Sequence, residues 1–326
     1  MSLQFGSWEL AQVLVKLAVY ACMAAVCGGM LVLCLLQREA ARVQLQGNAG
    51  QPARWVVQQR HGLLRHIAIA AAEGLLATVL LFLLQVGSVN QADLAGMFDP
   101  LLIRVLAATA VGTGIVCKLA GFALMLGAVV LVVGDSRLAR GAASGLPRWL
   151  PGAGGVALAL FAASFAVLGH TAVLSLPARF VTGVHVAAVL LWIGALLPLR
   201  RLATVGELPL LQPMLRRFGM LGWGLVGGLL AAGLVLLWNL LESPAALFNT
   251  SYGLLLLAKL LLVLCLLALA ALNKFRLVPT LTEQTRAPLR YSIGFELLLA
   301  GAIIVLTALL TTLTGPFELA DMSHSA

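Results

Sequence analysis

Two histidines, His170 and His185, carry the side chains in this sequence that are best suited to bind a metal ion. Each lies in an apolar run, and a short segment containing Pro177 separates the two runs. If the runs form antiparallel helices, the two imidazoles lie at a similar depth near the outer face of a membrane. Neutral imidazole binds copper, zinc and haem iron. The pair therefore predicts a shared metal site, and the alternative is that each histidine makes only a local hydrogen bond between helices.

Four sulfur atoms on the first apolar run form a second candidate set. They recur at i, i+4, i+7 and i+11, which is one face of a helix, and belong to Met23, Cys27, Met30 and Cys34. Because thiolate and thioether groups are soft ligands that suit Cu(I), this stripe could pass Cu(I) inward between weak sites. Methionine and cysteine are also ordinary packing residues, and core packing is the interpretation that the pattern alone favours.

Ionisable residues within the apolar runs form a third set, because a charge in hydrocarbon is costly enough to suggest a function. Three lysines lie in the outer half of the expected bundle and two glutamates in the inner half: Lys16, Lys118, Lys259, Glu73 and Glu296. The carboxylates could support an inward pathway for copper. The ammonium groups would repel a bare cation and suit a haem propionate, so copper and haem b stay alternative cofactors. A structural role is the alternative to both the copper and the haem interpretation. In that case Lys259 extends to the membrane interface and Glu296 pairs with Arg290.

Trp192 and several glycines are candidates for shaping such a site. Trp192 follows His185 by seven residues on the same helix face, where it either lines the site or only packs. Two glycine pairs are expected to allow helices to approach closely in lipid: Gly112 with Gly114, and Gly227 with Gly228. No phosphate-binding glycine loop, Cys-x-x-Cys, His-Glu-x-x-His or nucleophile elbow is present. The sequence therefore predicts that the protein is not an enzyme, with a redox role as the main alternative.

Membrane-spanning helices must position these residues. Of the 326 residues, 61% are hydrophobic and 10% are charged, and the apolar runs are continuous instead of alternating, so helices are expected. About 20 residues cross the hydrocarbon. The sequence predicts an all-α polytopic bundle, one transmembrane domain over 1–326, with eight spans near 8–36, 62–88, 104–134, 152–173, 179–198, 218–240, 253–273 and 291–313. The run from Leu101 is too long for one upright span, so its start is expected in the interface or the helix steeply tilted.

The loops between these runs alternate in charge. Arginines and lysines cluster after the first, third, fifth and seventh runs, whereas Asp93, Asp99 and Glu242 lie in the intervening loops. The positive-inside rule predicts four cytoplasmic loops and both termini on the periplasmic side. The net charge of +9 is thus a topology signal, and the lipid bilayer, not a nucleic acid, is the predicted partner. The oligomeric state is not predicted.

Three stretches resemble the CopD/PcoD family of bacterial copper-resistance membrane proteins. Residues 184–198 resemble its His-x6-Trp-x-Gly signature through His185, Trp192 and Gly194. Tyr252-Gly253 followed by Lys259, and then residues 273–279, are similar to the next landmark of the family, and residues 290–296 to a third. These stretches fall within roughly 180–310, and the layout of eight spans matches the family over the whole chain.

The resemblance implies a multi-pass protein of the bacterial inner membrane that takes part in copper resistance or homeostasis. Members are commonly assigned copper import from periplasm to cytoplasm, often with a separate periplasmic CopC-type copper-binding partner. His185, Trp192, Asn273 and Glu296 fall on motif positions, whereas His170 and the sulfur stripe depend on spacing alone. The expected function is copper binding and movement. The alternatives are a haem b redox protein that uses the same histidines and a scaffold that delivers copper to another protein.

Overall fold

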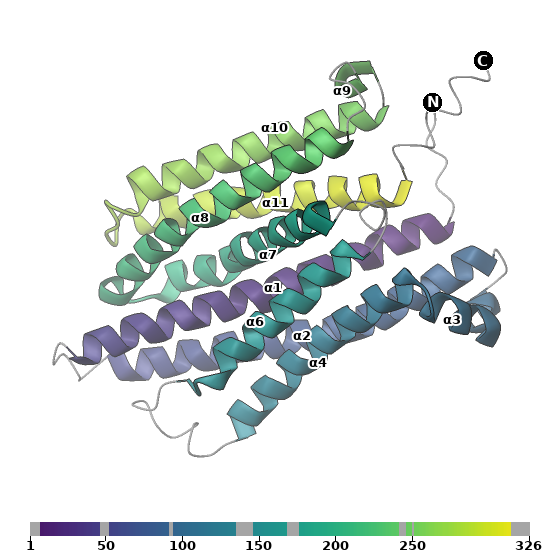
Figure 1. Cartoon of the computed structure of the whole chain (residues 1–326). Helices are drawn as coiled ribbons and strands as arrows, with labels where there is room; N and C mark the ends of the chain where they lie inside the picture. Colours follow the sequence, from purple (N-terminus) through teal and green to yellow (C-terminus); the bar gives the residue numbers. More distant parts are fainter. Residues whose placement is uncertain are drawn as a thin grey trace.

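Eight long apolar helices form the bundle in the part of the chain that the structure describes (Figure 1). The computed structural model describes residues 7–45, 52–90, 94–134, 146–167, 176–240, 246–249 and 251–313. The helices long and apolar enough to cross a membrane are α1 (Ser7–Leu45), α2 (Pro52–Asn90), α4 (Ala110–Gly134), α6 (Trp149–Ala166), α7 (Leu176–Val205), α8 (Leu208–Leu240), α10 (Ser251–Leu272) and α11 (Arg286–Leu313). A short α9 (Ala246–Asn249) precedes α10. The predicted all-α polytopic bundle with eight spans is confirmed.

The third predicted span is broken near its start. A 3-10 turn, η1 (Leu94–Phe98), and a short helix, α3 (Pro100–Ala107), precede α4. The Asp99 carboxylate accepts hydrogen bonds from the backbone N–H groups of Leu101 and Leu102 at 2.8 and 3.1 Å, which caps α3 at its first turn. The long apolar run is therefore two helices, and the spanning helix begins at Ala110 instead of the predicted 104.

The core of the bundle surrounds α1, which packs against α2, α4, α6, α7, α8 and α11. In the apolar centre of α1, 72% of the residues are buried, compared with 6% in that of α10. The central helix is therefore α1, and α10 lies at the periphery, where it contacts α11 and α9 (Figure 1).

Two glycines bring α1 and α7 together backbone to backbone. A Cβ added to Gly28 would lie 1.9 Å from the carbonyl carbon of Gly194, and a Cβ added to Gly194 would lie 1.8 Å from the carbonyl oxygen of Ala24. Only residues without a side chain permit this approach. In contrast, a Cβ on Gly227 or Gly228 would meet nothing within 4 Å in the described part of the chain, so the close packing predicted for that pair is wrong.

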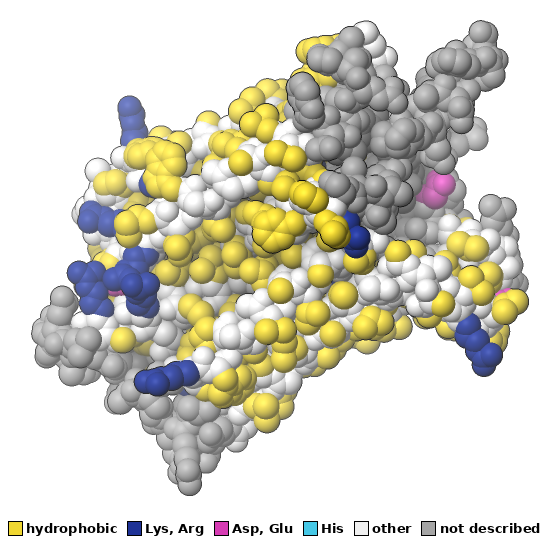
Figure 2. Space-filling view, viewed as in Figure 1, with side chains coloured by type: hydrophobic (Ala, Val, Ile, Leu, Met, Phe, Trp, Pro, Cys, Tyr) yellow, Lys and Arg dark blue, Asp and Glu magenta, His cyan; other side chains and the backbone are white. Residues whose placement is uncertain are grey.

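Lys and Arg side chains gather at one end of the bundle, opposite the end where α1 begins and α11 ends (Figures 1 and 2). We call it the basic end; it contains the α7–α8 and α10–α11 connections. The buried carboxylate of Glu39 on α1 forms ion pairs with Arg42 and with Arg217 on α8. Trp55 Nε1 on α2 donates a hydrogen bond to the carbonyl of Val205 on α7 at 3.0 Å. The gathering agrees with the charge alternation, while the periplasmic placement of both termini stays a prediction.

Candidate functional site

Of the predicted histidine pair, the structure places His185, whereas His170 lies outside the described residues. His185 lies on α7 with its ring against α8, where a Cβ on Gly233 would be 3.7 Å from Cε1 and 3.9 Å from Nδ1. His185 Nδ1 is buried and has no hydrogen-bond partner among the described residues. Nowhere in the described ranges do three or more His, Cys, Asp or Glu residues come together as a metal site. The shared ligand site therefore stays a prediction.

Lys259 is the predicted residue that the structure brings nearest to His185. It is half-buried on α10, and its ammonium group interacts electrostatically with the His185 ring, which also lies against the backbone of Leu229 on α8. Three helices, α7, α8 and α10, thus converge on this imidazole. An imidazole beside an ammonium group can accept a metal ion only in its neutral form.

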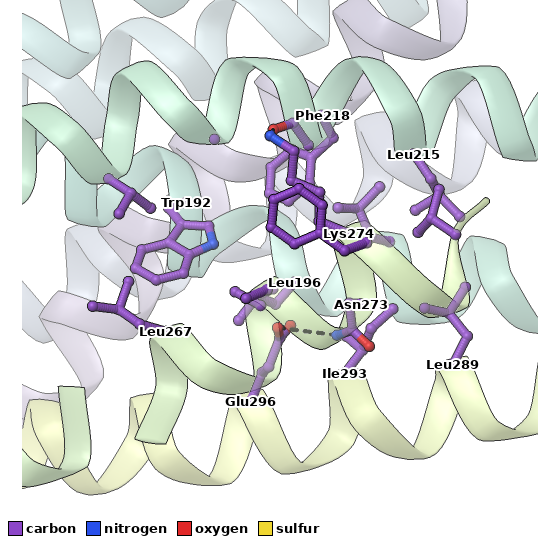
Figure 3. A pocket seen from close by; sticks show the side chains of 18 of the residues that line it. Trp192, Leu196, Leu215, Phe218, Leu267, Asn273, Lys274, Leu289, Ile293 and Glu296 are labelled. Carbon is purple, nitrogen blue, oxygen red and sulfur yellow. Dashed lines mark hydrogen bonds between the residues drawn. The ribbon is translucent and has the colours of Figure 1, made fainter. Parts of the chain in front are cut away.

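A cavity of about 300 Å³ lies between α7, α8, α10 and α11 (Figure 3). Most of its lining is apolar and includes Leu196, Leu215, Phe218, Leu267, Leu289 and Ile293. Trp192, Asn273 and Glu296, which are far apart in the sequence, all line it. Three of the four residues predicted from the family motif therefore meet in one cavity, and the fourth, His185, lies about 10 Å from Trp192 along α7.

The polar centre of this cavity is a hydrogen-bonded pair. Asn273 Nδ2 donates to Glu296 Oε1 at 3.0 Å (Figure 3), and the two residues are only 8% and 3% exposed. Asn273 Oδ1 has no hydrogen-bond partner among the described residues. The cavity thus offers carboxylate and amide oxygens in apolar surroundings, where an uncompensated charge is costly.

The predicted pairing of Glu296 with Arg290 is wrong. Within the described ranges Glu296 forms no salt bridge, and its partner is Asn273 on the neighbouring helix. The two residues are six positions apart on α11, which places them about 120° apart around the helix. Arg290 consequently faces a different part of the bundle and leaves the Glu296 carboxylate without a cation.

A π turn at the end of α10 explains how Asn273 reaches Glu296. The segment η3 (Asn273–Leu277) continues α10, and the N–H of Val278 donates to the carbonyl of Asn273 at 2.9 Å. Such wide turns are frequent at functional sites. Asn273, Lys274 and Phe275 all line the cavity, although three consecutive residues of an α-helix would spread over about 200°.

Lys274 closes one edge of the cavity without neutralising Glu296. Its Nζ donates to the carbonyl of Gly219 on α8 at 2.5 Å and lies 4.4 Å from the ring centroid of Trp223. A carbonyl oxygen and an aromatic face therefore hold the ammonium group. Apart from the family resemblance of residues 273–279, nothing in the sequence distinguishes Lys274 from the loop charges that set topology. Nothing in it distinguishes Trp223 and Phe218 from lipid-facing aromatics.

Trp192 both packs and lines the cavity, so its two predicted roles are compatible. Its side chain is 5% exposed. It belongs to a small apolar cluster with Ala188, Leu229, Leu266 and Ile303. The indole stands on the same wall as Leu196 and faces Phe218 across the cavity (Figure 3).

The sulfur stripe lies in the main core instead of the cavity. Met23, Cys27 and Met30 are buried and Cys34 is half-buried among the side chains of the core. Glu73 is exposed on α2, where it interacts electrostatically with Cys22. The cavity lining that the structure describes includes no residue of α1 or α2. These positions agree with core packing for the stripe, and a role in copper movement stays a prediction for it and for Glu73.

The fold and cavity define a multi-pass helical membrane protein with a buried carboxylate–amide pair in its C-terminal half. Residues 212–310 match the family model described as copper resistance protein D (CopD). The chain therefore carries a CopD domain over this range, which confirms the resemblance seen in this part of the sequence and supports the predicted multi-pass location in the inner membrane. The match includes Asn273, Lys274 and Glu296, whereas His185 and Trp192 precede it. No curated protein and no solved structure matches the chain.

Proposed function

We propose that this protein binds copper inside the bilayer and moves it from the periplasmic to the cytoplasmic side. The observation that supports the proposal best is the Asn273–Glu296 pair in the CopD domain, buried in a cavity that Trp192 also lines. The proposed role is transport, and it includes no catalytic step.

The charge balance of the cavity favours a cationic cargo. Among the described residues only Asn273 donates a hydrogen bond to the Glu296 carboxylate, and the Lys274 ammonium is directed to Gly219. A buried carboxylate needs a positive partner, because its desolvation otherwise costs several kcal/mol. In this proposal a copper ion supplies the positive charge when the cavity is loaded, and a proton supplies it when the cavity is empty.

The proposed copper route runs along α7, which carries His185 and Trp192. The unpartnered Nδ1 of His185 accepts copper nearer the outer face, with His170 as a proposed second ligand. The ion then passes Trp192, about 10 Å further along α7, and reaches the oxygens of Asn273 and Glu296. A separate CopC-type periplasmic protein is the proposed donor. The sulfur stripe on α1 does not line this route.

Copper uptake into sealed proteoliposomes tests the proposal. Glu296→Gln removes the charge and keeps the shape, and we expect at least a tenfold loss of flux, because a lost charge interaction of 1.4 kcal/mol is already tenfold. Glu283→Gln is the matched control, since it changes an exposed carboxylate in the α10–α11 connection that does not line the cavity. Equal flux in the wild type and Glu296→Gln would contradict the proposal. Bound copper with no flux in the wild type would instead indicate a delivery scaffold.

The electrostatic interaction of Lys259 with His185 favours one alternative, a haem b protein with the ammonium near a propionate. A visible absorption spectrum of the purified protein distinguishes the two. A Soret band that shifts on reduction supports haem, and stoichiometric copper without such a band supports the copper proposal. His185→Ala should remove the bound group in either case. His61→Ala is its control, because His61 is exposed and its Nδ1 contacts the carbonyl of Val57, in its own helix, at 2.8 Å.

A further inference from the structure

A second cavity, of about 430 Å³, lies at the basic end between α7 and α11. Its lining consists of Leu197, Arg200, Arg201, Thr204 and Arg290, and it shares no lining residue with the cavity around Glu296. Three arginines from two helices therefore line one space, in which Arg290 is half-buried and Arg200 and Arg201 are exposed. The positive-inside rule explains arginines at this end of the bundle, but it does not require them to converge.

No carboxylate balances these three arginines within the described ranges. The ion pairs of the basic end involve other arginines: Glu39 pairs with Arg42 and Arg217, and Glu283 pairs with Arg286. Like charges that line one space repel one another, even where part of the space is open to solvent. An anion in the cavity would remove this repulsion.

Contacts are present around two of the guanidinium groups, those of Arg200 and Arg290, and around the Thr204 hydroxyl. Gly294 on α11 leaves room for Arg200, because a Cβ there would lie 3.4 Å from Arg200 Nε and 3.7 Å from Cζ. Arg290 Cζ lies 5.7 Å from the ring centroid of Tyr291. Thr204 donates its hydroxyl proton to the carbonyl of Arg200 at 3.1 Å, which fixes the lone pairs of the hydroxyl.

We propose that this cavity binds a phosphate group, supplied by the headgroup of an anionic phospholipid. Guanidinium groups match the geometry of phosphate oxygens with paired hydrogen bonds, and basic pockets between membrane helices bind such headgroups. The surface next to Arg290 favours a lipid over free phosphate. Tyr291, Phe295 and Leu298 follow at i, i+4 and i+7 and are 61%, 59% and 70% exposed, so they offer an apolar stripe to the acyl chains.

This binding would tie α7 to α11 at the basic end. The two helices carry Trp192 and Glu296, so the lipid phosphate would sit beside the elements that form the other cavity without entering it. The inference is independent of the proposed copper function, because it uses different residues and a different ligand.

Native mass spectrometry of the full-length protein in detergent tests the inference with phosphatidylglycerol, phosphatidylcholine and inorganic phosphate as probes. The test variant is Arg200→Gln/Arg201→Gln/Arg290→Gln. The matched control is Arg38→Gln/Arg65→Gln/Arg216→Gln, which removes the same charge from exposed positions outside the cavity. We expect the wild type and the control to bind phosphatidylglycerol equally, and the test variant about tenfold or more weakly. Phosphatidylcholine should bind no better to the wild type than to the test variant.

The other outcomes are equally informative. Equal weakening in both triple variants would overturn the proposal, because it would show that net charge alone attracts the lipid. Equal binding of phosphatidylglycerol by the wild type and the test variant would overturn it as well. Inorganic phosphate that binds the wild type but not the test variant, without any lipid retention, would keep the phosphate site and assign it to a soluble ligand. If the triple variant does not fold, Arg290→Gln alone should still weaken phosphatidylglycerol binding severalfold, and unchanged binding would overturn the proposal.

Discussion

The substitution Gly194→Ala should destabilise the bundle strongly although it adds a single methyl group. The new Cβ would lie 1.8 Å from the carbonyl oxygen of Ala24. Carbon atoms need about 3.5 Å from non-bonded atoms, so α1 and α7 would have to separate by about 1.7 Å. The carbonyl oxygen of Ala24 belongs to the backbone of the central helix α1, so it cannot move away by a change of side-chain rotamer.

The magnitude follows from this geometry. Overpacking costs about 1–3 kcal/mol, and a clash with backbone lies at the upper end of that range. Separation also weakens neighbouring contacts, since a gap of about 0.5–1 Å already loses a quarter to a half of the attraction between two atoms. We therefore expect the free energy of unfolding to fall by about 3 kcal/mol.

Unfolding in mixed micelles of increasing SDS content, followed by tryptophan fluorescence, measures this free energy. Gly127→Ala on α4 is the matched control, because a Cβ there would meet nothing within 4 Å of the described structure. The control should be neutral or slightly stabilising, since alanine is the better helix former. If Gly194→Ala were as stable as Gly127→Ala, the backbone contact between α1 and α7 would not exist in the folded protein.

Three further substitutions should change the same free energy of unfolding. Phe122→Ala removes a ring that is 0% exposed and should cost about 3–5 kcal/mol; a loss below 1 kcal/mol would mean that the site collapses without a cavity. Glu39→Gln removes the buried negative charge that pairs with Arg217 and should lower the free energy of unfolding by about 1–3 kcal/mol. Its control is Glu283→Gln, which removes an exposed carboxylate and should cost less than about 1 kcal/mol. Trp55→Phe removes the indole N–H bond to a carbonyl of α7 at 3.0 Å and should cost about 1 kcal/mol, with no cost if water replaces that bond.

The sequence was sufficient to predict the number and type of the spans, because hydrocarbon imposes a minimum length of apolar helix. It also showed that the run from Leu101 to Gly134 was too long for one upright helix. Asp99 and Pro100, whose types favour a helix start, account for the beginning of α3, whereas the break itself lies at Ala108 and Thr109. Only the folded chain shows that α3 ends at Ala107 and that the spanning helix begins again at Ala110.

The residues of the site were easier to predict than their contacts. The resemblance to the CopD family identified Trp192, Asn273 and Glu296, but nothing in their spacing shows that α7, α10 and α11 meet. Pairing by proximity along the chain selected Arg290 for Glu296, whereas tertiary packing supplied Asn273. The same limit explains the error at Gly227, because the helix face that meets a neighbour is decided by the whole bundle.

Side-chain hydrogen bonds anchor the C-terminal end of α10 and the turn that follows it at the basic end. Asn273 and Lys274 bind Glu296 and Gly219, and Gln212 Nε2 donates to the carbonyls of Val278 and Pro279, both at 3.1 Å. The rest of α10 is largely exposed to lipid. We therefore expect α10 to tilt about its anchored end, which we call the pivot. Lys259 lies about 20 Å from the pivot along the helix axis. Since bilayer thickness sets helix tilt, we expect a thicker or thinner membrane to shift this lysine relative to His185, which makes the lipid itself a determinant of access to the imidazole.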